Sequence, residues 1–269
     1  MTRKYKAVIA YDGTGYSGWQ CQTNAVGVQQ VVEGVLEQLE GAPVRVFGSS
    51  RTDAGVHSRG FVGHFTLNVP IPPRNLVRAV NARLPDAVRF MRASYAAADF
   101  DARLSAKGKE YRYHLYQADI CPPHLAPYWA FCHRPLDLGA MREAAAHFVG
   151  RHDFVSFAAN PNRELESTVR NVFSFDVRKT GHRYVFIVRG DGFLYKQVRS
   201  MVGFLVSVGK GVERPGAVKE LLDAAKPRTA RVETAPSRGL FLWKVFYRDV
   251  PAEPSPACRA SLPSQRALA

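Results

Sequence analysis

The alternation of hydrophobic and polar residues divides the chain into strands and helices that follow the same order twice. In the first half, the pattern predicts strands over 4–12, 42–47, 60–69 and 87–96, and helices over 26–41 and 72–84. In the second half, it predicts strands over 109–118, 170–179, 182–190 and 240–249, and helices over 137–150, 192–211 and 216–227. Apart from the additional helix over 216–227, each half has the order β-α-β-β-α-β, which is typical of a ferredoxin-like unit.

This order predicts an α+β fold made of two ferredoxin-like halves. Each half would hold an antiparallel sheet backed by helices, with an active-site cleft between the halves. The predicted N-terminal half covers residues 1–104 and the C-terminal half covers 105–250. Residues 251–269 are rich in Pro, Ala and Ser and are expected to form a disordered tail. Residue identity between the halves is weak, so the duplication rests on the pattern alone.

The charge of the chain favours a polyanionic partner. The sequence has 37 Lys and Arg residues against 23 Asp and Glu residues, a formal net charge of +14. The basic residues are spread over the predicted elements and do not form a tail. A basic folded surface most often binds nucleic acid, and the alternative is a basic protein with no such partner.

The cysteines and the N-terminus favour a cytoplasmic protein. Four cysteines occur without regular spacing and without a C-x-x-C pair, which suits a reducing compartment. The first residues contain only a short apolar run, so neither a signal peptide nor a membrane-spanning segment is expected. Cys121, His124, Cys132 and His133 lie close in sequence, but their spacing matches no common zinc site. We therefore expect no metal.

Two further motifs fail in their context. Residues 13–18 read GTGYSG and follow a strand, but the next predicted helix begins too late for a dinucleotide-binding loop. Residues 59–65 read RGFVGHF and resemble an RNA-recognition strand, yet Gly63 stands where a second aromatic residue would stack on a base. Neither motif supports a function.

One acid stands out in the predicted turn between two strands. Asp53 is the only carboxylate in the stretch from residue 46 to residue 65, and Arg51 lies two positions before it. An Asp followed closely by a Gly is often a turn residue that bonds its own backbone. The alternative is a reactive carboxylate held beside a guanidinium.

Two other predicted elements carry candidate site residues. Arg199 lies in the strongly apolar helix over 192–211, so it would need a carboxylate partner unless it reaches the surface. Gly203 follows one turn later and would let another backbone come close. Tyr111 and Tyr113 share one face of a strand, where one of them could stack on a nucleobase or simply pack in the sheet.

These pieces together resemble one family. The run RTDAGVH at 51–57 is highly specific, and KEYRYHLY at 109–116, FLYKQVRSMVG at 193–203 and SRGLFLWKVFY at 237–247 follow it in order. The opening YDGTGYSGWQCQ, the helix VQQVVEGVLEQL and the link FDARLSAKGKEYRY add to the pattern. From about Tyr5 to Tyr247 the chain resembles the tRNA pseudouridine synthase A family.

The resemblance implies that the protein isomerises uridines at positions 38–40 in the anticodon arm of tRNA. It implies that Asp53 is the catalytic residue and that Arg51 enters the space left by the flipped nucleotide. Tyr111 would stack on the target base and could assist proton removal, and Arg199 would pair with Asp53 between the halves. The family uses no cofactor and acts as a homodimer on tRNA. One departure is Ser200, where the family usually carries Asn.

The chemistry agrees with this assignment. A base inside a stem must leave the stack before an enzyme can reach it, and an aromatic residue and a gap-filling side chain serve that step. An Arg beside the Asp favours the charged carboxylate. The alternative is a non-catalytic RNA-binding protein, which explains the basic charge but not an acid placed where it would weaken phosphate binding.

Overall fold

A computed structural model describes residues 2–20, 24–159 and 167–250. The strands are β1 Arg3–Tyr11, β2 Phe47–Gly48, β3 His57–Leu67, β4 Val88–Tyr95, β5 Gly108–Gln117, β6 Ala130–Cys132, β7 Gly150–Asp153, β8 Val169–Thr180, β9 Arg183–Gly190 and β10 Leu240–Phe246. The α-helices are α1 Val28–Glu40, α2 Pro73–Asn81, α3 Leu138–Ala146, α4 Gln197–Gly209 and α5 Ala217–Ala224. Short 3₁₀ turns cover Val155–Phe157 and Ser237–Gly239. The predicted disordered tail lies outside the described residues.

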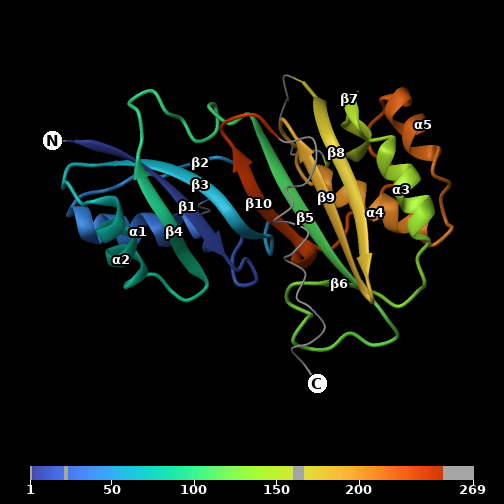
Figure 1. The fold of residues 1–269 in the computed structure, drawn as a ribbon, viewed down its shortest axis with the longest axis horizontal. Coiled ribbons are helices and arrows are strands. Elements are labelled where there is room, and N and C mark those ends of the chain that lie inside the picture. Colours follow the sequence, from blue (N-terminus) through green and yellow to red (C-terminus); the bar gives the residue numbers. More distant parts are fainter. Residues whose placement is uncertain (1, 21–23, 160–166, 251–269) are drawn as a thin grey trace.

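The strands form one sheet that runs through the molecule (Figure 1). Its order is β4-β1-β3-β10-β5-β9-β8-β7, with β2 paired to β3 and β6 paired to β5. The order β4-β1-β3-β2 on one side and β10-β5-β9-β8 on the other is the same arrangement made twice, as the ferredoxin-like pattern predicts. The α+β fold is therefore present.

The two sheets are joined into one by a parallel contact that the sequence pattern did not indicate. Strand β10 runs parallel to β3 at the pairs Phe241–His57 and Leu242–Ser58, while it runs antiparallel to β5. Strand β2 pairs with the same edge of β3 at His64 and Gly63, further along the strand. Because β2 is so short, the beginning of β3 stays open for β10.

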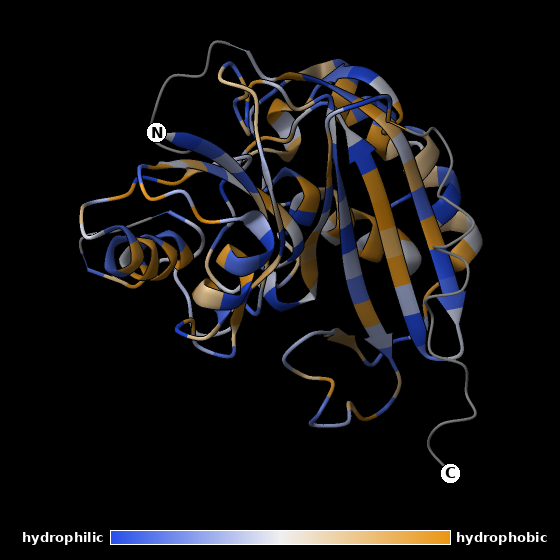
Figure 2. Ribbon diagram, turned by 60° about the vertical axis from the view of Figure 1, so that its left-hand side comes forward, coloured by the Kyte–Doolittle hydropathy of each residue, from blue (hydrophilic) through white to orange (hydrophobic). Residues whose placement is uncertain are grey.

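Helices cover one face of the sheet, and the strands alternate accordingly (Figure 2). Tyr5, Ala7, Ile9 and Tyr11 of β1 are buried, and the residues between them are partly exposed. In α1 the buried residues lie at helical spacing, and Gly41 ends the helix at φ 74° with its N–H bonded to the Glu37 carbonyl. Asp137 caps α3 by accepting a hydrogen bond from the Ala140 N–H.

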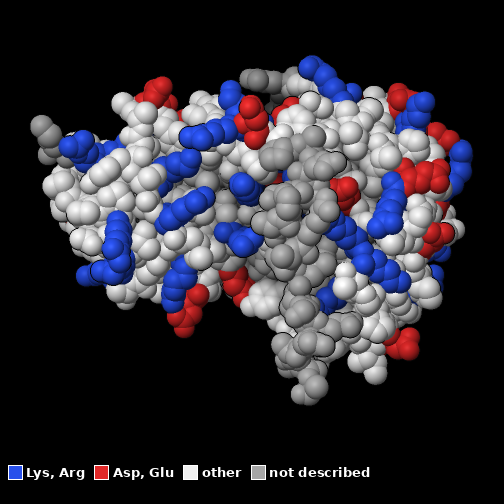
Figure 3. Space-filling model, viewed as in Figure 1, with Lys and Arg blue, Asp and Glu red and all other residues white. Residues whose placement is uncertain are grey.

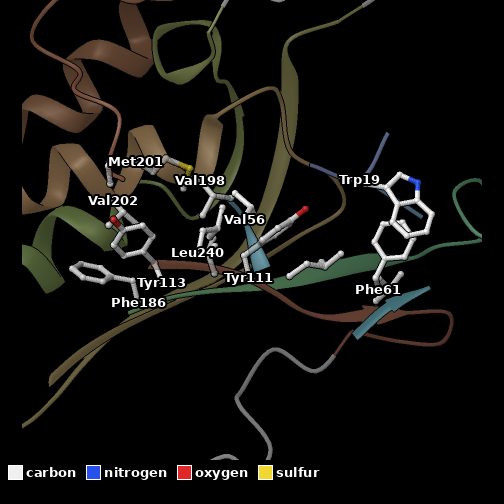
Figure 4. Packing of buried hydrophobic residues seen from close by; sticks show 14 of the residues in the cluster. Trp19, Val56, Phe61, Tyr111, Tyr113, Phe186, Val198, Met201, Val202 and Leu240 are labelled. Atoms are coloured by element: carbon white, nitrogen blue, oxygen red, sulfur yellow. The ribbon is translucent and has the colours of Figure 1, made fainter. Parts of the chain in front are cut away.

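The core near the junction of the halves combines aromatic residues with the apolar side of α4 (Figure 4). Trp19 stacks on Phe61 with ring centroids 3.8 Å apart. Tyr111 lies on β5 beneath Val198 and Met201 of α4, all of them buried. Aromatic pairs of this kind contribute about 0.5–1.5 kcal/mol beyond the area that they bury. The junction of the two halves is therefore tightly packed, which restricts the movement of the side chains that lie on it.

The strand predicted over 42–47 is reduced to two residues, and side chains of α1 explain why. Val44 and Val46 are buried and Arg45 is exposed, so the predicted alternation is present. However, Glu33 accepts a hydrogen bond from the Val46 N–H at 2.9 Å, and Gln29 donates to the Val46 carbonyl at 3.1 Å. The helix thus satisfies backbone groups that a neighbouring strand would otherwise bind.

The predicted ends of two helices were wrong. The helix predicted over 192–211 begins at Gln197, because Lys196 adopts the left-handed region at φ 59° and the Gln197 side chain binds the Leu194 N–H. The helix predicted over 137–150 ends at Ala146, and Gly150, at φ 117°, opens β7 instead. Strands β6 and β7 were not predicted, since short strands leave little periodicity.

Candidate functional site

Asp53 lies in the loop of residues 49–56 that joins β2 to β3, which we call the Asp53 loop. Its backbone is held from several sides. The Trp19 N–H donates to the Thr52 carbonyl at 3.3 Å, and the Gly55 N–H donates to the Tyr16 carbonyl at 3.2 Å. Tyr11 and Thr52 share a buried hydrogen bond between their hydroxyls at 2.9 Å. These contacts fix the loop onto the segment that follows β1.

Two glycines of the GTGYSG motif make this close packing possible. A Cβ on Gly13 would lie 2.1 Å from the Val56 carbonyl oxygen, and one on Gly18 would lie 2.2 Å from the Thr52 carbonyl oxygen. Gly18 also has φ +91°, which side chains rarely adopt. The glycines therefore serve the backbone of the Asp53 loop, which gives the motif a role other than dinucleotide binding.

The structure brings Arg199 and Asp53 together. Arg199 Nη1 donates to Asp53 Oδ2 at 2.9 Å, with the side chains 13% and 19% exposed. Arg199 belongs to the first turn of α4 in the C-terminal half, whereas Asp53 belongs to the N-terminal half. Such a partly buried charge-assisted hydrogen bond holds the carboxylate in one orientation. The pair therefore places an oriented acid at the junction of the halves.

The backbone of residue 235 holds Arg199 in place. Arg199 Nε donates to the Ala235 carbonyl at 2.8 Å, and the Ala235 N–H donates to the Arg199 carbonyl at 3.0 Å. A Cβ on Gly203 would lie 2.2 Å from the Glu233 carbonyl oxygen. The prediction that Gly203 admits another backbone is thus confirmed, and the segment that it admits orients Arg199.

Tyr111 lies beside this pair as a neutral phenol. Its side chain is 7% exposed and makes an edge-on contact with Phe193, with ring centroids 5.3 Å apart. Burial raises the pKa of Tyr111 to about 12, a hydrogen bond with Ser50 lowers it in part, and the nearby Asp53 charge raises it further. At neutral pH the phenol therefore keeps its proton, which disfavours Tyr111 as a general base.

Arg51 is exposed on the Asp53 loop two residues from Asp53. On the face shown in Figure 3, Lys and Arg side chains gather over the N-terminal half, while acidic and basic side chains are mixed over the other end. A basic face of this kind suits a polyanionic partner.

His57 was quoted in the RTDAGVH motif without a role, and the structure gives it a supporting one. The ring is buried and stacks on Phe241 with centroids 4.6 Å apart. The Gly13 N–H donates to Nδ1 at 3.0 Å, and Nε2 lies 3.2 Å from the Pro127 carbonyl and 3.1 Å from the Arg238 carbonyl. Burial lowers the pKa of His57, and Asp12 opposes this shift. His57 thus links the Asp53 loop to three other segments. The strand was predicted to begin at residue 60, so the pattern gave no signal for this role.

The described residues were also searched for other kinds of site. They hold no group of three His, Cys, Asp or Glu side chains that could bind a metal ion. Among the helices of residues 2–20, 24–159 and 167–250, none combines the length and the apolar character needed to cross a bilayer.

Comparisons with known proteins agree with the geometry. The chain matches the sequence model of a family described as tRNA pseudouridine synthase over residues 7–104 and 144–248, which include Asp53 and Arg199 but not Tyr111. The protein from Exiguobacterium sibiricum named tRNA pseudouridine synthase A is 41% identical over 91% of this chain and 97% of its own length.

Other relatives with the same name give similar values. The protein from Chlamydia trachomatis serovar A is 42% identical over 92% of this chain and 93% of its own length. The protein from Syntrophotalea carbinolica is 43% identical over 90% of this chain and 95% of its own length. A solved Cbf5-Nop10-Gar1 complex aligns with 76% of this chain and 54% of its own at 14% identity, with a TM-score of 0.31, which is too low to carry an argument. On the sequence comparisons, the chain belongs to the tRNA pseudouridine synthase family.

Proposed function

We propose that this protein converts uridine to pseudouridine at positions 38–40 in the anticodon arm of tRNA. The observation that carries the proposal is the Asp53–Arg199 ion pair at the junction of the halves, next to the buried phenol of Tyr111. A binding module would gain nothing from an acid held at this place, because a carboxylate repels RNA phosphates. An isomerase of uridine needs such a group.

The reaction is balanced without an external reagent. The bond from ribose C1′ to uracil N1 breaks, the uracil turns, and C1′ bonds to C5, while the hydrogen of C5 leaves and N1 gains one. Asp53 supplies a carboxylate that acts on the nucleotide as a nucleophile or as a base. Arg199 points this carboxylate in one direction, since its guanidinium is itself held by Ala235.

Tyr111 and Arg51 handle the flipped nucleotide in this proposal. Extruding a base from a stem costs a few kcal/mol, so a stacking partner and a side chain that fills the gap both help. Tyr111 offers a ring whose position is fixed by Phe193, and the exposed Arg51 lies on the same loop as Asp53. Because the pKa of Tyr111 is raised to about 12, its role is to bind the base and not to remove a proton.

We further propose that the protein acts in the cytoplasm as a homodimer, so that one tRNA reaches both subunits. The two halves of one chain, 1–104 and 105–250, form the site of each subunit. Light scattering of the purified protein with and without tRNA tests the dimer. A monomer under both conditions would contradict it.

Release of tritium from tRNA that carries 5-tritiated uridine tests the activity directly. The label leaves only when C5 becomes the new glycosidic carbon. We expect release by the native protein, none by Asp53→Asn, and unchanged release by the surface control Asp99→Asn. Absence of release by the native protein, with tRNA still bound, would favour the non-catalytic RNA-binding alternative.

A further inference from the structure

Arg199 is oriented by residues 232–236, a segment that we call the strap. The strap lies on α4 where Gly203 leaves room for the Glu233 carbonyl. Ala235 forms hydrogen bonds both to the side chain and to the backbone of Arg199. Any movement of the strap along α4 would therefore turn the guanidinium away from Asp53.

Arg228 ties the strap to the helix at a neighbouring point. Its Nη1 donates to Thr234 Oγ1 at 2.6 Å and to Ser200 Oγ at 3.1 Å. Thr234 directly precedes Ala235, and the fully buried Ser200 directly follows Arg199. The two hydroxyls themselves lie 3.5 Å apart. One guanidinium thus bridges the two segments whose relative position sets the direction of Arg199.

The charge of Arg228 is not explained by an ion pair. In the part of the chain that the structure describes, no carboxylate pairs with it, whereas Arg231 nearby forms two hydrogen bonds with Glu213 at 2.9 and 2.7 Å. Arg228 also lies against Ser200 in the first turn of α4. The helix dipole is positive at that end, so it disfavours a cation there. A half-buried guanidinium in this place is best explained by the two hydrogen bonds that it donates.

We propose that Arg228 is a positioning residue that acts through Ser200 and the strap to aim Arg199 at Asp53. Among the described residues its side chain bonds Ser200 and Thr234, whereas Asp53 is bonded by Arg199. The inference rests on the proposed function, because the orientation of Arg199 matters only if Asp53 reacts. The Ser200 hydroxyl accepts the bond from Arg228.

The test measures single-turnover tritium release and tRNA affinity for Arg228→Met, Arg228→Lys and the matched control Arg231→Met. A reacting group displaced by about 1 Å can cost up to about 100-fold in rate, so we expect Arg228→Met to lose about 10- to 100-fold. The dissociation constant for tRNA should change less than about twofold, and Arg228→Lys should recover much of the rate because an ammonium also donates to both hydroxyls. Arg231→Met should keep the native rate.

Three results would overturn the proposal. The first is an Arg228→Met rate within twofold of the native rate, and the second is a loss seen only in tRNA affinity, which would make Arg228 a phosphate contact. The third is an equal loss in both Arg→Met variants, which would indicate general destabilisation. If Arg228→Met does not fold, Thr234→Val removes one acceptor at constant shape, and Thr234→Ser restores it.

A second measurement separates this inference from the proposed function. The Arg199 Nε–H proton can be followed by nuclear magnetic resonance without substrate and assigned by its loss in Arg199→Lys. We expect its exchange with water to be faster in Arg228→Met than in the native protein and in Arg231→Met. Unchanged exchange would refute the positioning role. Failure of the native protein to release tritium would instead refute the proposed function.

Discussion

At the scale of residues, the site depends on how one arginine and one phenol lie beside a single acid. Sequence alone indicated that Arg199 needs a carboxylate and that Asp53 lies beside a guanidinium, and the structure pairs these two. Because Arg199 comes from the other half of the chain, the orientation of the Asp53 carboxylate depends on the packing of the whole junction.

Arg199→Met should reduce turnover. Removal of the guanidinium leaves the partly buried Asp53 carboxylate without the donor that orients it. We expect a loss of about 100-fold or more at neutral pH, in line with the removal of a preorganised charge contact. Single-turnover tritium release at saturating tRNA checks this. A rate within twofold of the native rate would mean that the pair does not support the reaction.

Tyr111→Phe should keep most of the activity. The phenol is neutral because its pKa is raised to about 12, so the substitution removes a hydrogen bond to Ser50 but no proton acceptor. We expect a loss of less than about tenfold, since one neutral hydrogen bond contributes about 0.5–1.5 kcal/mol. Tyr113→Phe is the matched control, because its hydroxyl donates to the Pro236 carbonyl on the same face of β5. Complete loss of tRNA binding by Tyr111→Phe would contradict the stacking role.

At the scale of elements, the periodicity located the long strands and helices, and local contacts decided their ends. The hairpin of β8 and β9 lies where alternation and Thr180-Gly181 predicted it. The first strand beside Asp53 is short because side chains of α1 bind the backbone of Val46. Such competition between a side chain and a strand partner depends on residues far away in the sequence. It could not be read from the pattern at 42–47.

Gly18→Ala should disturb the Asp53 loop more than its size suggests. The new Cβ would lie 2.2 Å from the Thr52 carbonyl oxygen, and the residue has φ +91°. We expect a loss of about 1–3 kcal/mol in the free energy of unfolding, together with a fall in tritium release because the loop must shift. Gly15→Ala in the same turn is the control, since nothing lies within 4 Å of its Cβ position. Urea unfolding of both variants checks this. Equal free energies of unfolding for Gly18→Ala and Gly15→Ala would show that the loop accommodates the new Cβ without strain.

At the scale of the whole molecule, the repeated β-α-β-β-α-β order predicted the fold but not the joining of its two sheets. The parallel contact of β3 with β10 involves only two residue pairs, so it leaves no periodic signal in the sequence. The joined sheet buries polar groups on the face away from the helices. Glu110 lies between Arg112 and Arg189 at 2.8 and 2.7 Å, and all three are buried. Individual polar residues in a strand do not reveal such a cluster until their partners are known.

A histidine on the face of the sheet away from the helices makes the stability of the protein depend on pH. His114 stacks on Trp129, and burial, with Arg112 and His57 adding to it, lowers the pKa of His114 to about 4. The unfolded chain takes up this proton near pH 6.5, so between pH 6.5 and 4 it binds more protons than the folded protein. The free energy of unfolding should therefore fall as the pH drops through this window, by up to about 3 kcal/mol from this residue alone. Urea unfolding at pH 7 and at pH 5 measures this change in the free energy of unfolding. His114→Phe keeps an aromatic ring and should make the difference between the two pH values smaller. The exposed control His133→Phe should leave that difference unchanged. An equal pH dependence in His114→Phe and the native protein would show that this ring is not held neutral by the fold.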